Sequence, residues 1–178
     1  MTANQSRTDR TSMVAHYIIS HTEPAQLGAV KLNKIMWRAD VLAYRRFGRT
    51  ITGQTSYIRM PYGPVPNGMA ATLRRLVSEG KIVERAADAG VGQRREFVWL
   101  ERRTAAGFEA EEVEILHQAI DEIAPLSAVA ASDETHDVLW DEISNGAQIP
   151  IRAASVQPAP LEPEDFEWLE SELRQTVS

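Results

Sequence analysis

The side chains best suited to acid–base or metal chemistry in this sequence are its histidines, and their spacing gives them no obvious partners. The four are His16, His21, His117 and His136. His16 and His21 are five residues apart, which puts them on different faces of a helix, and no HExxH or similar metal-binding spacing occurs. The pattern therefore favours partly buried, hydrogen-bonded histidines over catalytic ones.

His136 is the histidine that lies among several carboxylates. Asp133, Asp137 and Asp141 recur every four residues, on a different helical stripe from His136. A carboxylate–histidine pair or a site for a hard cation is the chemistry that such a segment could support. A metal-dependent enzyme centred on residues 133–141 is therefore kept as a third hypothesis, although we predict that the protein holds no metal and no cofactor.

Other catalytic classes lack their usual sequence features. The chain contains no cysteine, which excludes disulfides, zinc–thiolate sites, iron–sulfur clusters and cysteine nucleophiles. It has no GxSxG motif, and the glycines at 48–53 and 90–92 match neither the Walker loop nor the dinucleotide fingerprint. We therefore predict a protein that acts by binding and is not an enzyme.

Length and composition predict one soluble domain. The chain has 178 residues, of which 43% are hydrophobic, enough for a domain with its own core. The first ten residues lack the apolar core of a signal peptide, and nowhere do about eighteen apolar residues run together. These features predict a cytoplasmic protein with no membrane partner.

The net charge of −6 hides two halves of opposite charge. Residues 1–104 hold 17 lysines and arginines against 8 aspartates and glutamates, whereas residues 105–178 hold 2 against 17. Two explanations are open. The halves pack together and neutralise each other, or a basic face is offered to an acidic partner.

Hydrophobic periodicity predicts a mainly helical α+β fold in a single domain over residues 1–157, with a proline-tethered acidic helix or tail at 158–178. Five or six helices are expected, drawn from residues 10–22, 31–47, 67–80, 108–124, 133–143 and 164–174. The helix at 31–47 is apolar on two faces, which predicts a central position, and Gly48 is a suitable C-terminal cap. A small antiparallel sheet is expected from residues 55–60, 81–86 and 94–100.

Residues 61–66, Pro-Tyr-Gly-Pro-Val-Pro, restrict the backbone more tightly than an ordinary loop does. Proline fixes φ and also limits the residue before it. One interpretation is a turn from strand to helix, with Pro64 or Pro66 at the helix start. The other is a preorganised ledge on which a partner docks, and the two are compatible.

A helix followed by two strands is also the order found in a winged helix. In that interpretation Arg74 and Arg75 enter the major groove, while Arg94 and Arg95 lie on the DNA backbone. Acidic residues flank these arginines, which argues against it. A DNA-binding transcriptional regulator is the alternative function.

Three motifs follow one another between Leu32 and Val65, namely Leu32-Asn33-Lys34-Ile35-Met36-Trp37, Gly48-Arg49-Thr50-Ile51-Thr52-Gly53 and Tyr62-Gly63-Pro64-Val65. In this order they resemble the Panacea domain of SocA-like bacterial antitoxins. A looser match of His136 to Trp140 with Ile149-Pro150 extends the resemblance over roughly residues 12–152.

The resemblance implies an antitoxin that binds and neutralises a cognate toxin. For SocA-like members it further implies a proteolytic adaptor that delivers the toxin to the ClpXP protease. Tyrosine, tryptophan and arginine commonly anchor interfaces, so those near the ledge in sequence, and one tryptophan of the acidic tail, are the candidate contacts. The candidate partner-binding residues are Trp37, Arg45, Arg46, Arg59, Tyr62, Gly63, Pro64 and Trp168.

Overall fold

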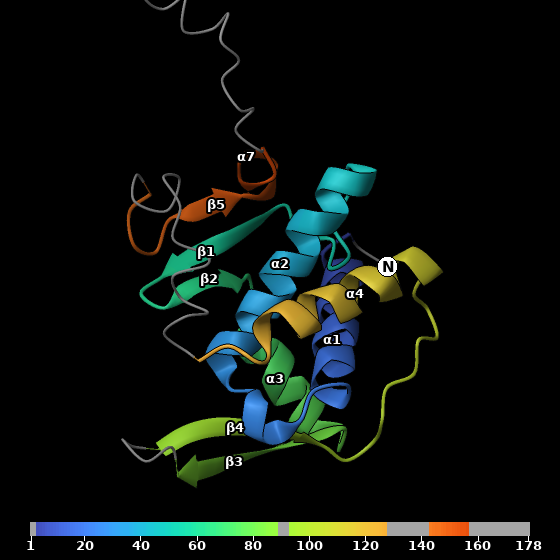
Figure 1. Ribbon diagram of the computed structural model, residues 1–178, viewed down its shortest axis with the longest axis vertical. Helices are drawn as coiled ribbons and strands as arrows, with labels where there is room; N and C mark the ends of the chain where they lie inside the picture. Colours follow the sequence, from blue (N-terminus) through green and yellow to red (C-terminus); the bar gives the residue numbers. More distant parts are fainter. Residues whose placement is uncertain (1–2, 89–92, 128–142, 157–178) are drawn as a thin grey trace, which may run out of the picture.

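A computed structural model describes residues 3–88, 93–127 and 143–156 of the chain. Figure 1 shows this part as a helical body flanked by two small sheets, which confirms the predicted mainly helical α+β fold. The helices are α1 (Ala3–Ser20), the short 3-10 helix η1 (Pro24–Gln26), α2 (Ala29–Phe47), α3 (Met69–Ser78), α4 (Ala110–Ile123) and α7 (Ile151–Ala154). The strands are β1 (Ser56–Met60), β2 (Gly63–Pro66), β3 (Ile82–Asp88), β4 (Gln93–Trp99) and β5 (Gln148–Pro150).

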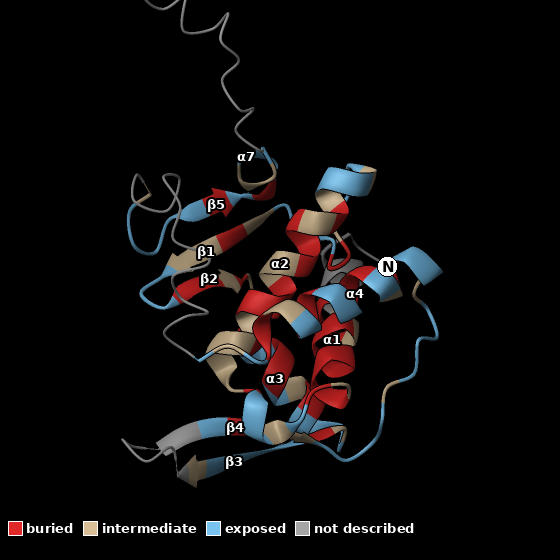
Figure 2. Cartoon of the chain, viewed as in Figure 1, coloured by how far each residue is buried: buried red, intermediate tan, exposed pale blue. Residues whose placement is uncertain are grey.

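Helix α2 is central, as its two apolar faces predict. It contacts α1, α4, α7 and strands β2 and β4, and Figure 2 shows how much of it is buried. Gly48 has a left-handed φ of 69° and its N–H donates to Tyr44 O at 2.8 Å, which confirms the predicted cap. The core also takes in two charged side chains of this helix, Lys34 and Asp40.

The strands form two antiparallel sheets instead of the single sheet that was predicted. Strand β1 lies between β2 and β5, whereas β3 and β4 form a separate hairpin. The segments 55–60, 81–86 and 94–100 do contain strands, but the prediction that they pair in one sheet was wrong. Strand β5 has three residues, too few for an alternating pattern to reveal it as the partner of β1.

Two helices begin where the sequence pattern did not place them. Helix α1 starts at Ala3 and not at residue 10. The pattern missed its first two turns because residues 3–9 are mostly polar and carry no apolar stripe. Helix α3 starts at Met69, after Gly68 with a φ of 76°, so neither Pro64 nor Pro66 initiates it. Both prolines belong to strand β2.

Helix α4 packs against α2 and brings acidic side chains of the second half onto the basic first half. Its ion pairs with residues of the first half are Arg10–Glu112, Arg38–Glu122, Arg46–Glu114, Arg49–Glu109 and Arg49–Glu112. In the described part of the chain, the division of charge therefore reflects two halves that fold against each other.

Candidate protein-interaction site

The proline-rich segment forms the return strand of a hairpin, and not a turn from strand into helix. Met60 pairs with Gly63 and Tyr57 with Pro66, so the chain reverses at Pro61 and Tyr62. Strand β2 is an edge strand, the position in a sheet where prolines are tolerated because an outward N–H is not needed for pairing. The restricted segment is therefore half of a β-hairpin, and the docking of a partner on it stays a prediction.

Gly63 holds this hairpin close to helix α2. Its φ is 132°, which side chains rarely adopt, and a Cβ placed there would come 2.8 Å from Nζ of Lys34. Lys34 is itself only 1% exposed. Two residues of the sequence motifs, far apart in the chain, thus depend on each other: glycine leaves the space that the buried lysine fills.

Trp37 of helix α2 packs against the first strand of the hairpin. Its ring contacts that of Tyr57 edge to face, with centroids 5.0 Å apart, and Tyr57 is fully buried. The Tyr57 hydroxyl donates to Asp40 Oδ2 at 2.8 Å. Burial and the neighbouring Asp40 raise the pKa of Tyr57 well above its ordinary value, so this hydroxyl remains a donor.

Asp40 connects the hairpin to the loop at residues 48–53. Its carboxylate accepts the N–H of Ile51 at 2.9 Å and the N–H of Thr52 at 3.0 Å, and it also accepts the Thr52 hydroxyl. Burial raises the pKa of Asp40 to about 6, against the opposing effect of these hydrogen bonds. Sequence reasoning missed Asp40, although an isolated carboxylate in a helix that is apolar on two faces is the signal that could have revealed it.

The tip of the hairpin is the part of this unit that reaches solvent. Tyr62 is 72% exposed and Met60 is 43% exposed, whereas Gly63 and Pro64 behind them are buried. A large aromatic and a methionine therefore project from a backbone whose position is fixed by Gly63, Pro64 and the residues beneath.

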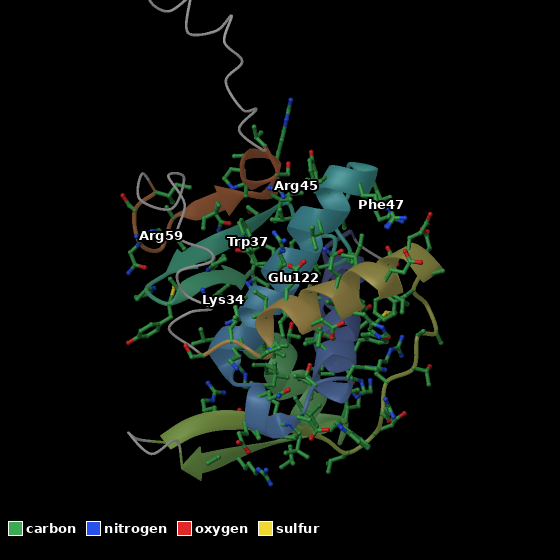
Figure 3. All side chains as sticks on the ribbon, viewed as in Figure 1. Lys34, Trp37, Arg45, Phe47, Arg59 and Glu122 are labelled. Carbon is green, nitrogen blue, oxygen red and sulfur yellow. The ribbon has the colours of Figure 1, made fainter. Side chains whose placement is uncertain are left out.

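Two of the three predicted arginines lie away from this tip. Figure 3 places Arg45 near the end of α2, and its Nε donates to Ser155 O at 3.0 Å, while Arg46 faces Glu114 at 3.5 Å. Arg59 lies on β1 and is paired with Pro64 of β2, and its backbone bonds to Gly146 and Ala147. The structure thus places Arg59, Gly63 and Pro64 in one hairpin, with Trp37 packed on Tyr57 of its first strand, and leaves Arg45 and Arg46 apart. Trp168 lies outside the described residues.

Two of the four arginines of the winged-helix interpretation are paired with acids. Arg75 lies 2.7 Å from Asp9, and Arg95 donates to Glu84 at 2.7 Å. Arg74 is exposed, and the side chain of Arg94 is not among those described. Because paired arginines attract phosphates less strongly, the described surface adds no support for DNA binding.

The histidines of the described chain make local contacts. His16 Nε2 lies 2.7 Å from Glu101 O, and His21 stacks on Tyr17 with ring centroids 4.0 Å apart. Burial lowers the pKa of both histidines. No group of three or more histidines and acids within the described ranges is arranged to hold a metal, and the segment 133–141 with His136 lies outside them.

None of the described helices combines the length and the apolar surface that crossing a bilayer needs.

Comparison with known proteins agrees with the three motifs. The family model described as "Antitoxin SocA-like, Panacea domain" matches residues 32–141, which span helices α2 to α4 and the hairpin built on Gly63. The match is shorter than the range of about 12–152 that the motifs had suggested. No curated protein and no solved structure matches the chain significantly. The family match covers more than half of the sequence, and the chain belongs to the SocA-like antitoxin family with a Panacea domain.

Proposed function

We propose that this chain is an antitoxin that binds a cognate toxin protein directly and neutralises it without catalysis, in the cytoplasm. Family membership supports an antitoxin role in general. Direct binding is supported by the hairpin tip, where exposed Tyr62 and Met60 stand on a backbone that is already ordered. A preordered surface loses little conformational entropy when a partner docks.

The observation that carries the proposal is the 72% exposure of Tyr62 on this supported turn. Tyrosine is a frequent energetic anchor of interfaces because it offers apolar area and a hydroxyl at low entropic cost. The backbone of the hairpin is held in place by the contacts of Gly63, Tyr57 and Trp37. We therefore place Tyr62 at the centre of the toxin-binding surface.

Replacing Tyr62 with alanine is expected to weaken the purified complex about thirtyfold, which corresponds to about 2 kcal/mol for an interface anchor. The toxin would be the co-expressed product of the neighbouring gene, and titration calorimetry would give the dissociation constant. Trp99→Ala is the matched control, because Trp99 is an exposed aromatic on the other hairpin. Equal affinity of Tyr62→Ala and the native chain would exclude the hairpin tip, and failure to form any complex would contradict direct binding.

We further propose that the acidic segment 158–178, through Trp168, adds to this contact. A chain that ends at residue 157 enters the same titration as one more variant. Unchanged affinity would count against a role for this segment.

We also propose that the chain delivers the toxin to the ClpXP protease. In a reaction with purified ClpXP and ATP, the toxin is expected to disappear at least several times faster when the chain is present. The Tyr62→Ala variant should lose this stimulation in proportion to its lost affinity. A toxin half-life that does not respond to the chain would leave simple sequestration as the mode of neutralisation.

A further inference from the structure

A second surface, next to the β1–β2 hairpin, is a groove with exposed apolar side chains. The groove, of about 680 Å³, runs between the start of α2, strand β2, helix α3 and the β3–β4 hairpin. Its apolar wall is formed by Val65, Met69, Leu73, Val77 and Val83. Val77 and Val83 are 41% and 40% exposed, so apolar surface remains in contact with water there.

A charged side chain in the groove points to what would fill it. Arg74 lines the same groove, is exposed and forms no ion pair with a described residue. By contrast, Glu84 and Arg95 at the rim are paired with each other. An occupant would therefore supply apolar side chains and a carboxylate for Arg74.

The occupant should not be an added β-strand. Strand β2 is the sheet edge beside the groove, and two of its four residues, Pro64 and Pro66, have no N–H to donate. Prolines on an edge strand prevent further strands from pairing with it. A helix that lays its apolar face into the groove avoids this problem, because its own backbone is already hydrogen-bonded.

The groove adjoins the proposed toxin-binding tip. Val65 follows Tyr62 by three residues on the same hairpin, a separation of about 10 Å along an extended chain. We propose that the groove binds an acidic amphipathic helix of the toxin, with its apolar face on Val77 and Val83 and a carboxylate on Arg74. This inference rests on the proposed function and names the chemistry of the partner's contact segment.

The identity of the occupant can be tested by photocrosslinking in the native cells. The full chain would carry p-benzoylphenylalanine in place of Val77, with ClpXP blocked, and the crosslinked peptide would be sequenced by mass spectrometry. We expect an apolar peptide rich in aspartate or glutamate from the polypeptide that copurifies with the chain. The same residue in place of Val156, which is exposed after α7, is the matched control and should not capture this peptide.

Other results would overturn the proposal in distinguishable ways. Crosslinks to residues 158–178 of the same chain, or to a second copy of it, would assign the groove to a different occupant. A copurifying toxin without a crosslink from Val77 would overturn the groove proposal and leave the antitoxin proposal standing. Absence of any copurifying protein would overturn both.

Affinity measurements on the crosslinked pair give an independent test. Arg74→Glu and Val77→Asp are each expected to weaken the purified complex at least tenfold, whereas Val156→Asp should not change it. Both groove side chains are exposed, so unchanged circular dichroism and melting temperature would show that the fold is intact. Changing the acidic residue of the toxin that faces Arg74 to lysine should restore binding to the Arg74→Glu variant. If neither substitution in the groove weakens binding and the lysine restores none, the groove is refuted as a binding surface.

Discussion

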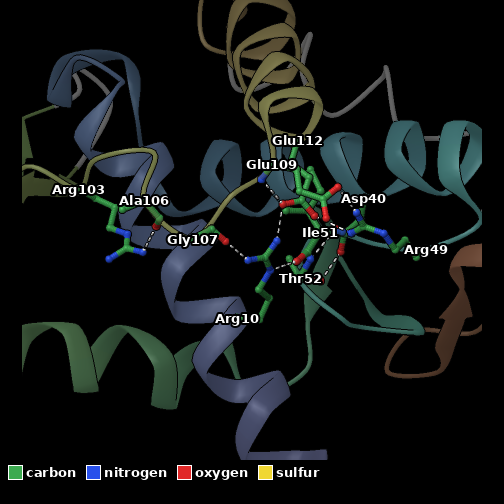
Figure 4. Close-up of polar contacts among 10 residues, drawn as sticks. All are labelled: Arg10, Asp40, Arg49, Ile51, Thr52, Arg103, Ala106, Gly107, Glu109 and Glu112. Atoms are coloured by element: carbon green, nitrogen blue, oxygen red, sulfur yellow. Dashed lines mark hydrogen bonds and ion pairs between the residues drawn. The ribbon is translucent and has the colours of Figure 1, made fainter.

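Replacing Asp40 with alanine is expected to lower the free energy of unfolding by about 3–5 kcal/mol. The carboxylate accepts hydrogen bonds from two backbone N–H groups, at Ile51 and Thr52, and from the hydroxyls of Thr52 and Tyr57. Figure 4 shows Asp40 beside Ile51 and Thr52. All four donors are buried, and each loses its acceptor when the carboxylate is removed. Denaturant unfolding followed by tryptophan fluorescence measures the change.

Asp40→Asn is the control that separates hydrogen bonding from charge. Its amide oxygen can still accept the two backbone N–H groups, so we expect a clearly smaller loss of stability than with alanine. An equal loss for both variants would mean that the negative charge, and not the hydrogen bonds, is what the fold requires.

The pH dependence of the free energy of unfolding, compared between the native chain and Asp40→Asn, gives a second measurement. The pKa of Asp40 is raised in the folded state to about 6 from an ordinary value of 3.8. Such a group contributes stability that is complete below pH 3.8 and is lost as the pH rises through about 6. The stability of the native chain relative to Asp40→Asn should therefore fall between about pH 4 and pH 7, and a constant difference would contradict the raised pKa.

The position of Asp40 explains why the three sequence motifs occur together. The carboxylate bonds to the loop at 48–53 on one side and to Tyr57 on the other, and Tyr57 contacts Trp37 of the first motif. The third motif is held by Gly63 over Lys34. The residues of the three motifs therefore pack together into one unit that includes the hairpin. We expect Asp40→Ala to weaken toxin binding indirectly, by loosening the support of the hairpin tip.

Much of the helical fold was predictable because it depends on local signals. The two apolar stripes and Gly48 placed helix α2 within two residues of its observed ends, and acidic residues marked the start of α4. Strand pairing was not predictable in this way, since β1 pairs with a three-residue strand about ninety positions later in the chain. The prolines of β2 were wrongly predicted to start a helix, because a proline-rich strand at a sheet edge has the same composition as a turn.

The candidate site was predictable only in part. Proximity in sequence grouped Arg45 with Tyr62, but a helix advances about 1.5 Å per residue, so Arg45 lies about 16 Å along α2 from Lys34, beside which the hairpin packs. The groove was not foreseen, because its walls come from five separate elements, α2, β2, α3, β3 and β4. Asn33 belongs to the first motif, but its side-chain oxygen is buried and accepts no hydrogen bond from a described residue, which only the placement of the neighbouring helices and strands reveals.

Of the acids whose ion pairs join the two charged halves in the described part of the chain, Glu112 is the most buried. This side chain is 1% exposed, and its carboxylate meets Arg10 at 2.5 Å and Arg49 at 2.6 Å (Figure 4). It also accepts the N–H of Glu109 at 3.1 Å, closing a capping box at the start of α4. Burial raises the pKa of Glu112, but hydrogen bonds from Arg49, Glu109 and Arg10 outweigh this effect and lower it below its ordinary value.

Replacing Glu112 with alanine is expected to lower the free energy of unfolding by about 3 kcal/mol. Removing one partner of a buried pair costs about 3–5 kcal/mol, but Arg10 and Arg49 can turn partly into water, which reduces the loss, while the broken capping box adds about 1 kcal/mol. Urea unfolding at neutral pH measures the change. Glu111→Ala is the matched control, since Glu111 is an exposed neighbour on the same turn and should change stability by less than about 0.5 kcal/mol.

The decisive comparison between the native chain and Glu112→Ala is that of their free energies of unfolding at acidic pH. Because the pKa of Glu112 is lowered by folding, its contribution is complete above the ordinary value of 4.5 and is lost as the pH falls through the folded value. The stability gap between the two proteins should therefore narrow below about pH 4.5. This direction is opposite to that expected for Asp40. A gap that stays constant in acid would show that Glu112 acts through packing, and that the charged halves of the chain are joined by contacts other than this carboxylate.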